Sequence, residues 1–441
     1  MPDRLTDDRR ISRDVASDQP QRRDRIYRDN SVGQRVVPAS AGMNDPNSSL
    51  SNLRESAKPR LTPQLTLAMA VAAGFAAANV WYNQPMIGVI ARDLPAPSQL
   101  AALIPTATQI GFAVGIVLLL PLGDRMDRRT LILRQTVWLA LALLSAANAP
   151  GIGPLIAASA AVGAGACIAQ QIVAFAADLA PAQSRGQAVG TVMSGLLSGI
   201  LLGRLLSGTV ARLLGWRAVF LMAAALATFM GVLLAWMLPR SEPRTRSSYA
   251  GLLFSILELV RAHAALRRAT LVQSGLFGGF SAFWSLLALK LQAPPLGLGS
   301  DVAGLFGVLG AAGVVVATLA GRLSDRYGPR GVIRAGIGLA AGGFVAMWAM
   351  PGIAGLIIGL LLLDLGVQGA QVANQSIIYG LQPDARGRLN TVFMSGMFVG
   401  GAVGSGAAAL GWAFAGWPAV CAVGLMLVAG SYLAHFSSAR G

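Results

Sequence analysis

Twelve apolar runs, most about 20 residues long or longer, fill the chain between residues 65 and 436. A helix of about 20 apolar residues matches the hydrocarbon thickness of a bilayer, so each run predicts a membrane span. Because 54% of the 441 residues are hydrophobic and only 12% are charged, a soluble enzyme or nucleic-acid binder is nearly excluded. We therefore expect an all-α integral membrane protein. The expected spans are 65–90, 100–122, 131–149, 152–177, 188–211, 216–238, 269–291, 302–319, 332–350, 353–381, 389–412 and 417–436.

Polar segments flank and divide these spans. Residues 1–64 are rich in Arg, Asp, Ser and Pro and lack apolar periodicity, which predicts a disordered cytoplasmic tail. Met43 offers a second plausible translation start within it. The 12 basic residues of this tail are offset by nine acidic ones, so the net charge of +16 does not indicate nucleic-acid binding. Residues 239–268 are expected to form a cytoplasmic loop with a short amphipathic segment, and residues 437–441 a C-terminal tail.

Side chains that could perform catalysis or bind a metal are scarce. Cys167 and Cys421 both lie inside apolar runs, and His263 and His435 are far from each other and from other ligands. We therefore expect no disulfide framework, no metal site, no cofactor and no enzymatic activity.

The distribution of Lys and Arg predicts the orientation in the membrane, because basic flanks resist translocation. With both termini in the cytoplasm, 18 basic residues fall on the inner side after the tail. Only Arg92, Arg212, Arg217 and Lys290 then fall outside. We expect a multi-pass protein of the inner (plasma) membrane with both termini inside.

An internal repeat divides the spans into two sets of six. Four pairs of identical residues are separated by the same 201 positions: Asp124 and Asp325, Arg185 and Arg386, Gly195 and Gly396, and Trp216 and Trp417. Six intervening spans leave both copies in the same orientation, which predicts parallel halves at 65–238 and 269–436 with a substrate cavity between them.

One short motif occurs once in each half. Residues 121–129 read PLGDRMDRR after Leu120, and residues 321–330 read GRLSDRYGPR. Both resemble the cytoplasmic loop motif of the major facilitator superfamily, G-x-x-x-D-R-x-G-R-R, and the resemblance extends over residues 65–436. The second copy keeps both glycines, whereas the first has Leu120 and Asp127 in their places.

The resemblance implies a cytoplasmic gate in which each motif aspartate faces the start of a helix in the other half. Asp124 would face residues 387–390, and Asp325 the start of the fifth span near Gly186. Asp178 could compete for Arg125 or Arg128 when the cavity opens inward. Alternatively, these charges are interfacial anchors and topology signals. The gate candidates are Asp124, Arg125, Arg128, Arg129, Asp178, Arg185, Asp325, Arg326, Arg330 and Arg386.

Small residues recur every four positions in spans 5 and 11, a spacing that lets helices approach closely. Their placement resembles the glycine-rich fifth helix of drug:proton antiporters, although Arg204 replaces the proline usual there. Close packing alone is the alternative explanation. The strings at 82–85, 203–208 and 386–390 resemble the arabinose-efflux-permease-like exporters of the superfamily.

Arg204 and Asp364 are the two charges predicted to lie deep inside spans. A guanidinium in a span is unfavourable unless it is paired or hydrated. The two residues lie at compatible depths, about 10 and 16 Å from the outer face at 1.5 Å per residue. Asp364 could carry the coupling proton in competition with Arg204 or substrate, or the two could form a permanent structural ion pair.

Amide and aromatic side chains on five spans could bind a neutral or weakly polar solute by directional hydrogen bonds. Some of them could instead bridge helices. The cavity candidates are Asn79, Trp81, Tyr82, Asn83, Gln84, Gln109, Gln170, Gln171, Trp284, Gln368, Gln371, Asn374 and Gln375.

Taken together, the sequence predicts a twelve-helix secondary transporter in the major facilitator fold. We expect it to export a small organic solute, drug or sugar-like, in exchange for protons, with the lipid bilayer as its other partner and no nucleic acid. The alternatives are an uncoupled facilitator or importer and, from another class, a polytopic membrane sensor.

Overall fold

The computed structural model describes residues 61–94, 97–181, 184–243, 245, 248–310, 320, 322–324, 326–382 and 385–437. These residues form helices joined by turns, with no strand among them. Most of residues 1–64 and of 437–441, expected to be tails, lie outside this range. The helices are α2 (Pro63–Ala78), α3 (Asn83–Asp93), α4 (Ser98–Ala101), α5 (Leu103–Leu119), α6 (Leu122–Arg125), α7 (Arg128–Ala147), α8 (Ile152–Ala166), α9 (Ile168–Leu179), α10 (Arg185–Leu214), α11 (Trp216–Met237), α12 (Tyr249–Ala262), α13 (Ala264–Gln292), α14 (Ser300–Leu309), α16 (Pro329–Ala349), α17 (Ile353–Tyr379) and α18 (Arg386–Phe436).

The membrane-spanning character of the helices agrees with the sequence prediction. Within the described residues, ten helical segments are long and apolar enough to cross a membrane. One of them, α18, covers the last two expected spans and is interrupted by non-helical backbone at Ala415 and Gly416. The expected span 302–319 begins as α14, and residues 311–319 lie outside the described range.

The first expected span is not one continuous helix. α2 ends at Ala78, residues 79–82 form a turn, and α3 resumes at Asn83. The Asn79 side chain donates from Nδ2 to the Phe75 carbonyl oxygen (2.6 Å), in competition with the regular helical pattern. This turn brings Trp81 and Tyr82 to the middle of the span.

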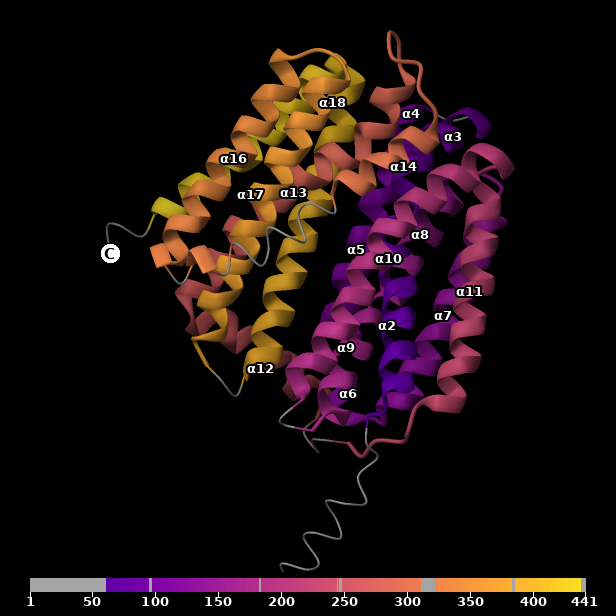
Figure 1. Cartoon of the computed structure of the whole chain (residues 1–441), viewed down its shortest axis with the longest axis vertical. Coiled ribbons are helices and arrows are strands. Elements are labelled where there is room, and N and C mark those ends of the chain that lie inside the picture. The colour runs from indigo at the N-terminus through magenta and orange to yellow at the C-terminus, as the bar shows by residue number, and fades with distance from the viewer. Residues whose placement is uncertain are drawn as a thin grey trace, which may run out of the picture. The chain divides into compact units, whose positions relative to one another are not determined.

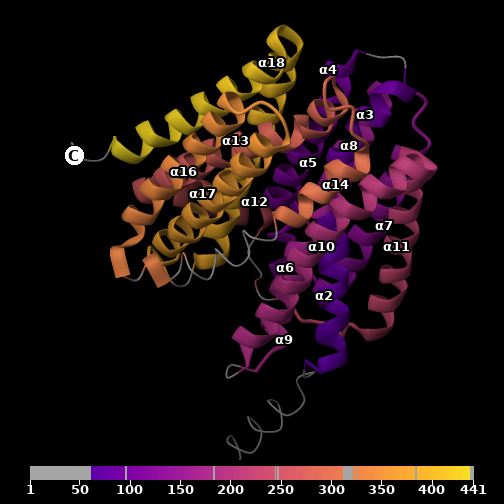
Figure 2. The same cartoon turned by 45° about the horizontal axis from the view of Figure 1, so that its top comes forward.

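Glycines allow two matching helix pairs to pack backbone to backbone. A Cβ added to Gly199 of α10 would collide with the Gly74 backbone of α2, and one added to Gly400 of α18 would collide with the Ser274 backbone of α13. α2 and α10 run side by side in Figures 1 and 2. Close backbone approach at small residues is how helices associate in membranes. The four-residue spacing seen in the sequence therefore serves helix packing in both halves.

The repeat also extends to backbone geometry. Gly215 between α10 and α11 has φ +86°, and Gly416, 201 positions later, has φ +62°. Only glycine adopts such angles without strain, so both halves turn sharply at the same place before Trp216 and Trp417. Below, residues 65–238 are called the first half and residues 269–436 the second half.

Candidate functional site

The Arg204 side chain is buried between the two halves and is stabilised by three neighbours. It is 5% exposed, and its Nε and Nη2 atoms both donate to Gln84 Oε1 at 3.2 Å. Its guanidinium carbon lies 4.7 Å from the ring centre of Trp81 and 3.9 Å from that of Trp284. Two indole faces and an amide oxygen thus replace the water that a buried cation has lost.

Asp364 of α17 is 3% exposed, and its Oδ2 atom has no hydrogen-bond partner in the described part of the chain. It interacts electrostatically with Arg204, yet the described residues form no ion pair between the two within 4 Å. The direct pairing expected from the sequence is thus corrected to a longer-range attraction, because Gln84 and the two indoles surround the guanidinium.

Two glycines, one in α14 and one directly after it, lie next to Arg204 and Asp364. A Cβ on Gly307 would lie 3.0 Å from the Arg204 Cβ atom. A Cβ on Gly310 would lie 3.4 Å from Asp364 Oδ2 and 3.8 Å from the Trp284 ring. The absence of side chains on this face of α14 leaves room for the two charged groups and the indole.

An aromatic cluster adjoins Arg204, and the sequence did not single out its phenylalanines. Trp81 lies 6.2 Å from Phe277, 6.4 Å from Phe280 and 6.3 Å from Phe398, measured between ring centres. Phe398 in turn lies 4.4 Å from Phe112. The spacing of residues 277, 280 and 284 on one face of α13 was the available signal, but the same spacing is typical of any buried helix.

The predicted amides separate into groups with different surroundings. Gln109 is 1% exposed, and neither its oxygen nor its nitrogen has a partner among the described residues. Three others bridge segments: Asn83 donates to Thr108 Oγ1, Gln171 to the Leu119 carbonyl oxygen, and Asn374 to Gln273 Oε1. The remaining glutamines are half-buried, and no hydrogen bond from their side chains is seen in the described chain; they are Gln170, Gln368, Gln371 and Gln375. Asn79 and Tyr82 line a separate pocket inside the first half.

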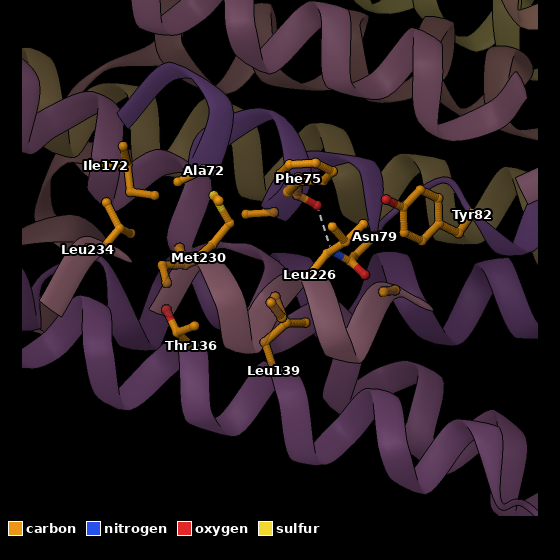
Figure 3. Close-up of a pocket in the computed structure, with 14 residues that line it drawn as sticks. Ala72, Phe75, Asn79, Tyr82, Thr136, Leu139, Ile172, Leu226, Met230 and Leu234 are labelled. Carbon is orange, nitrogen blue, oxygen red and sulfur yellow. Dashed lines mark hydrogen bonds between the residues drawn. The ribbon is translucent and has the colours of Figure 1, made fainter. Parts of the chain in front are cut away.

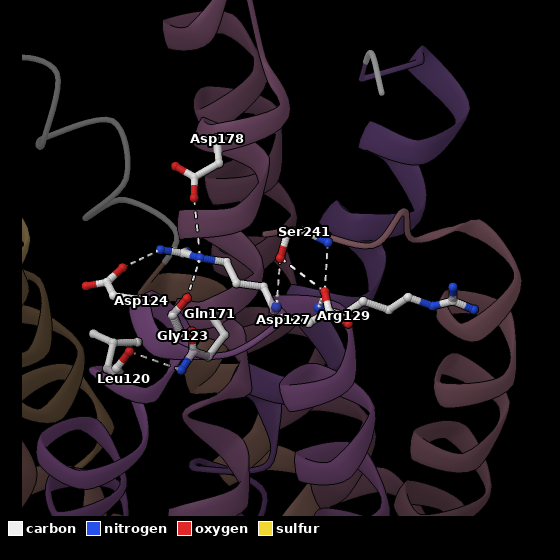
Figure 4. Close-up of polar contacts among 9 residues, drawn as sticks. Leu120, Gly123, Asp124, Asp127, Arg129, Gln171, Asp178 and Ser241 are labelled. Carbon is white, nitrogen blue, oxygen red and sulfur yellow. Dashed lines mark hydrogen bonds and ion pairs between the residues drawn. The ribbon is translucent and has the colours of Figure 1, made fainter. Parts of the chain in front are cut away.

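Arg128 organises the first copy of the loop motif, and its partners Gly123, Asp124 and Asp178 are labelled in Figure 4. Its Nη2 atom contacts Asp124 Oδ1 at 2.8 Å, and its Nε atom contacts Asp178 Oδ2 at 3.3 Å. Nε also donates to the Gly123 carbonyl oxygen at 3.1 Å. Arg129 donates to the Ala235 carbonyl oxygen, which ties the loop to α11.

Asp127 caps the start of α7, whereas the second copy of the motif has Gly328 at the start of α16. In the second copy Gly328 precedes α16 with φ +77°, whereas Asp127 precedes α7 with an ordinary φ of −58°. Its carboxylate caps the helix by accepting from the Arg129 and Thr130 amides, and it also accepts from the Ser241 amide. Burial raises the pKa of Asp127, but hydrogen bonds from Thr130 and Ser241 outweigh this effect and hold the pKa below its usual value.

The contact expected between Asp124 and residues 387–390 is absent from the described part of the chain. Asp124 contacts Arg128 instead, and its carbonyl oxygen accepts from the Thr245 amide of the loop between the halves. Asp325 lies outside the described residues. Arg386 donates to the Tyr379 carbonyl oxygen, and Arg326 stacks on Tyr327. The side chains of three further candidates are exposed: Arg125, Arg185 and Arg330.

Hydrogen bonds between the halves gather at the opposite end of the helices. Thr106 donates to Ser405 Oγ at 2.9 Å, and Ser300 donates to the Gly208 carbonyl oxygen at 2.9 Å. Arg212 pairs with Asp301 at the same end. Near the Asp124 loop, by contrast, the described residues form no hydrogen bond between the two halves. The halves are therefore held together at the end away from the start of α2.

Comparisons with known proteins agree with this fold. The family model described as Major Facilitator Superfamily matches residues 69–405. The chain is 39% identical to "Uncharacterized transporter YgaY" of Escherichia coli O157:H7, over 77% of this chain and 86% of the relative. It is 28% identical to "Chloramphenicol resistance protein" of Pseudomonas aeruginosa, over 67% and 72%. A solved bacterial homologue of the human lysosomal transporter Spinster, inward-facing and occupied, superimposes with TM-score 0.66 at 15% identity, over 84% of this chain and 95% of that one.

Proposed function

The chain belongs to the major facilitator superfamily and is a multi-pass membrane transporter, and we propose that it exports a small organic solute in exchange for protons by alternating access. The single observation that supports this proposal best is the buried Arg204, held between an indole of each half, with the unpartnered Asp364 nearby. An intramembrane charge without a direct partner is a candidate for function rather than for stability.

We further propose that both termini lie in the cytoplasm, as the distribution of basic residues favours. The end of the bundle that holds Thr106, Ser405, Arg212 and Asp301 then faces outward. Polar contacts between the halves at that end, and none at the Asp124 end of the described chain, correspond to an inward-facing arrangement. The contact between Asp178 and Arg128 also fits a cavity that is open to the cytoplasm.

Proton binding is coupled to opening of the outer side because Arg204 lies on one half and its neighbours Trp284 and Asp364 lie on the other. Arg204 lies on α10 of the first half, whereas Trp284 and Asp364 lie on α13 and α17 of the second. Opening the outer side separates the guanidinium from the Trp284 ring and from the carboxylate. An ionised Asp364 opposes this separation by electrostatic attraction, and protonation removes the opposition. An empty, deprotonated transporter is therefore held inward-facing, which prevents loss of the proton gradient without export.

The side chains around Arg204 favour a neutral, partly aromatic solute. Trp81 and four phenylalanines supply apolar faces, and Gln109 supplies a donor and an acceptor that no described residue uses. The resemblance to a relative named "Chloramphenicol resistance protein" supports the same substrate class. We propose neutral aromatic amides and alcohols of the chloramphenicol type as the first substrates to test.

The test is a reconstitution experiment with a matched control. The wild type, Asp364→Asn and Asp93→Asn are placed in liposomes with a proton gradient, and gradient collapse is recorded on addition of chloramphenicol, sugars or cationic drugs. Asp93 is a suitable control because it pairs with Arg217 within the first half. We expect collapse in the wild type and in Asp93→Asn and none in Asp364→Asn.

Each other outcome has a definite meaning. Collapse in all three proteins would retain the antiporter and reject Asp364 as the proton carrier. Chloramphenicol uptake without any proton movement in the wild type would identify an uncoupled facilitator.

A further inference from the structure

The first half contains a small cavity that the proposed transport site does not use (Figure 3). It lies among α2, α7, α9 and α11, and neither Arg204 nor Asp364 lines it. Most of the lining side chains are apolar, and the polar ones are Asn79, Tyr82 and Thr136. The cavity volume is about 20 Å³. This is enough for one water molecule, which needs about 10–15 Å³, and too small for an organic ligand.

Asn79 contributes a buried hydrogen-bond acceptor to this cavity. The residue is 5% exposed, and its Nδ2 atom donates to the Phe75 carbonyl oxygen. No described residue donates to its Oδ1 atom. A buried acceptor without a donor is unfavourable, so this position favours a ligand that can donate a hydrogen bond.

Tyr82 supplies a second polar group to the same cavity. The residue is 2% exposed, and its hydroxyl forms no hydrogen bond within the described chain. Figure 3 shows this hydroxyl on the side of the ring that faces Asn79. The Tyr82 hydroxyl can donate, whereas Asn79 Oδ1 can only accept. A water molecule between them satisfies both groups, because it accepts from one and donates to the other.

The second half shows the equivalent place without a polar side chain. Gly74 of α2 and Ser274 of α13 pack in the same way on α10 and α18, so residues of the first span correspond to residues 200 positions later. Asn79 therefore corresponds to Gly279, and a Cβ added to Gly279 would lie 3.1 Å from the ring of Phe344. An aromatic ring fills this place, and α13 continues through it without a break. In the described chain, the polar side chain, the cavity and the break in the helix thus coincide in the first half.

We propose that the cavity binds one water molecule, which donates to Asn79 Oδ1 and accepts from the Tyr82 hydroxyl. The water thereby bridges the first and last residues of the turn at 79–82. The backbone amides of residues 79–81 bond to carbonyl oxygens three residues earlier rather than four, so the helix is distorted at this turn. A buried water links the side chains across that distortion.

The water stabilises a segment that contacts Arg204. Trp81 lies inside the turn, and its ring centre is 4.7 Å from the Arg204 guanidinium carbon. The Tyr82 ring packs against Gly203, the residue before Arg204, because a Cβ added to Gly203 would lie 2.8 Å from that ring. Binding of the water itself requires no assumption about substrate, coupling or direction of transport.

Radiolytic hydroxylation of the purified full-length protein tests for this water. A short X-ray pulse converts water to hydroxyl radicals, which modify a side chain beside a bound water even when bulk solvent cannot reach it. We expect hydroxylation of the buried ring at position 82, located by peptide mass spectrometry. Asn79→Leu and Tyr82→Phe each remove one partner of the water and keep that ring. Each should reduce its hydroxylation about tenfold, as loss of one hydrogen bond predicts.

Phe344 is the matched control, because its ring is fully buried and fills the equivalent place in the second half. We expect no hydroxylation of Phe344 in any of these proteins. Tyr82→Phe, the milder change, decides the test alone if Asn79→Leu does not fold.

Thermal unfolding provides an independent measurement. Either substitution releases the water, so Asn79→Leu and Tyr82→Phe together should lower the unfolding temperature little more than one of them alone. Asn374→Leu removes a buried amide of the second half that bonds directly to Gln273, and its effect should add fully to that of Tyr82→Phe. The proposal would be overturned by an unmodified Tyr82 in the wild type, by equal hydroxylation in the wild type and the folded variants, or by additive losses for the Asn79 and Tyr82 substitutions.

Discussion

At the scale of single residues, Arg204 depends on the shape of its side chain as well as on its charge. A guanidinium is planar, can donate two hydrogen bonds to one oxygen, and stacks on indoles, whereas an ammonium group does none of these equally well. We expect Arg204→Lys to reduce the initial transport rate about tenfold, in keeping with about 1–2 kcal/mol for a desolvated cation–π contact. Rates in liposomes at equal protein density provide the measurement. A lysine variant as fast as the wild type would contradict this account of the site.

Asp127 is expected to stabilise the protein in a pH-dependent way. Asp127→Ala removes the cap of α7 and the hydrogen bond to Ser241, which costs about 1–2 kcal/mol at neutral pH. Because the folded protein holds the pKa of Asp127 low, its contribution is complete above the unfolded pKa and is lost as the pH falls through the folded pKa. The difference in unfolding temperature between the wild type and Asp127→Ala should therefore shrink on acidification. Asp127→Asn, which keeps a capping side chain, should be the milder variant at pH 7.

At the scale of helices, the contact between α2 and α10 leaves no space for a side chain at its centre. A Cβ on Gly199 would meet the Gly74 backbone, which cannot move aside as a flexible side chain can, so Gly199→Ala should destabilise by about 1–3 kcal/mol. Gly190 of the same helix is the matched control, because a Cβ added there would meet no atom within 4 Å. Tryptophan fluorescence during heating should show a lower unfolding temperature for Gly199→Ala and none of this loss for Gly190→Ala.

Helix-scale features differ in how readily sequence predicts them. Hydropathy located the spans because bilayer thickness sets their length, but it did not show the turn at residues 79–82 that interrupts the first span. The turn depends on a local bond between Asn79 and Phe75, which hydropathy does not measure. Likewise, Arg204 was conspicuous as a charge in an apolar run, whereas its contact with Gln84 joins residues 120 positions apart and required the folded structure.

At the scale of the whole molecule, the polar contacts at the outward end should lock the protein when made covalent. Thr106 and Ser405 have hydroxyl groups 2.9 Å apart on different halves, so cysteines at both positions should form a disulfide on oxidation. The buried Cys167 and Cys421 are first replaced by alanine. We expect oxidation to abolish transport and reduction to restore it. Cysteines at Asp124 and Arg388 should not cross-link in the empty protein, and efficient cross-linking there would contradict the inward-facing assignment.

The loop between the halves carries a consequence for how far they can move. Ser241, Thr245 and Tyr249 hydrogen-bond in turn to Asp127, to the Asp124 carbonyl oxygen and to the Leu118 carbonyl oxygen. Leu259 of α12, by contrast, packs with second-half residues that include Leu389. The first part of the loop is therefore bound to the first half by hydrogen bonds, and α12, which begins at Tyr249, packs against the second half through Leu259. Because α12 connects these two sets of contacts, rocking of the halves must either move α12 relative to one half or break the hydrogen bond from the Tyr249 hydroxyl to the Leu118 carbonyl oxygen.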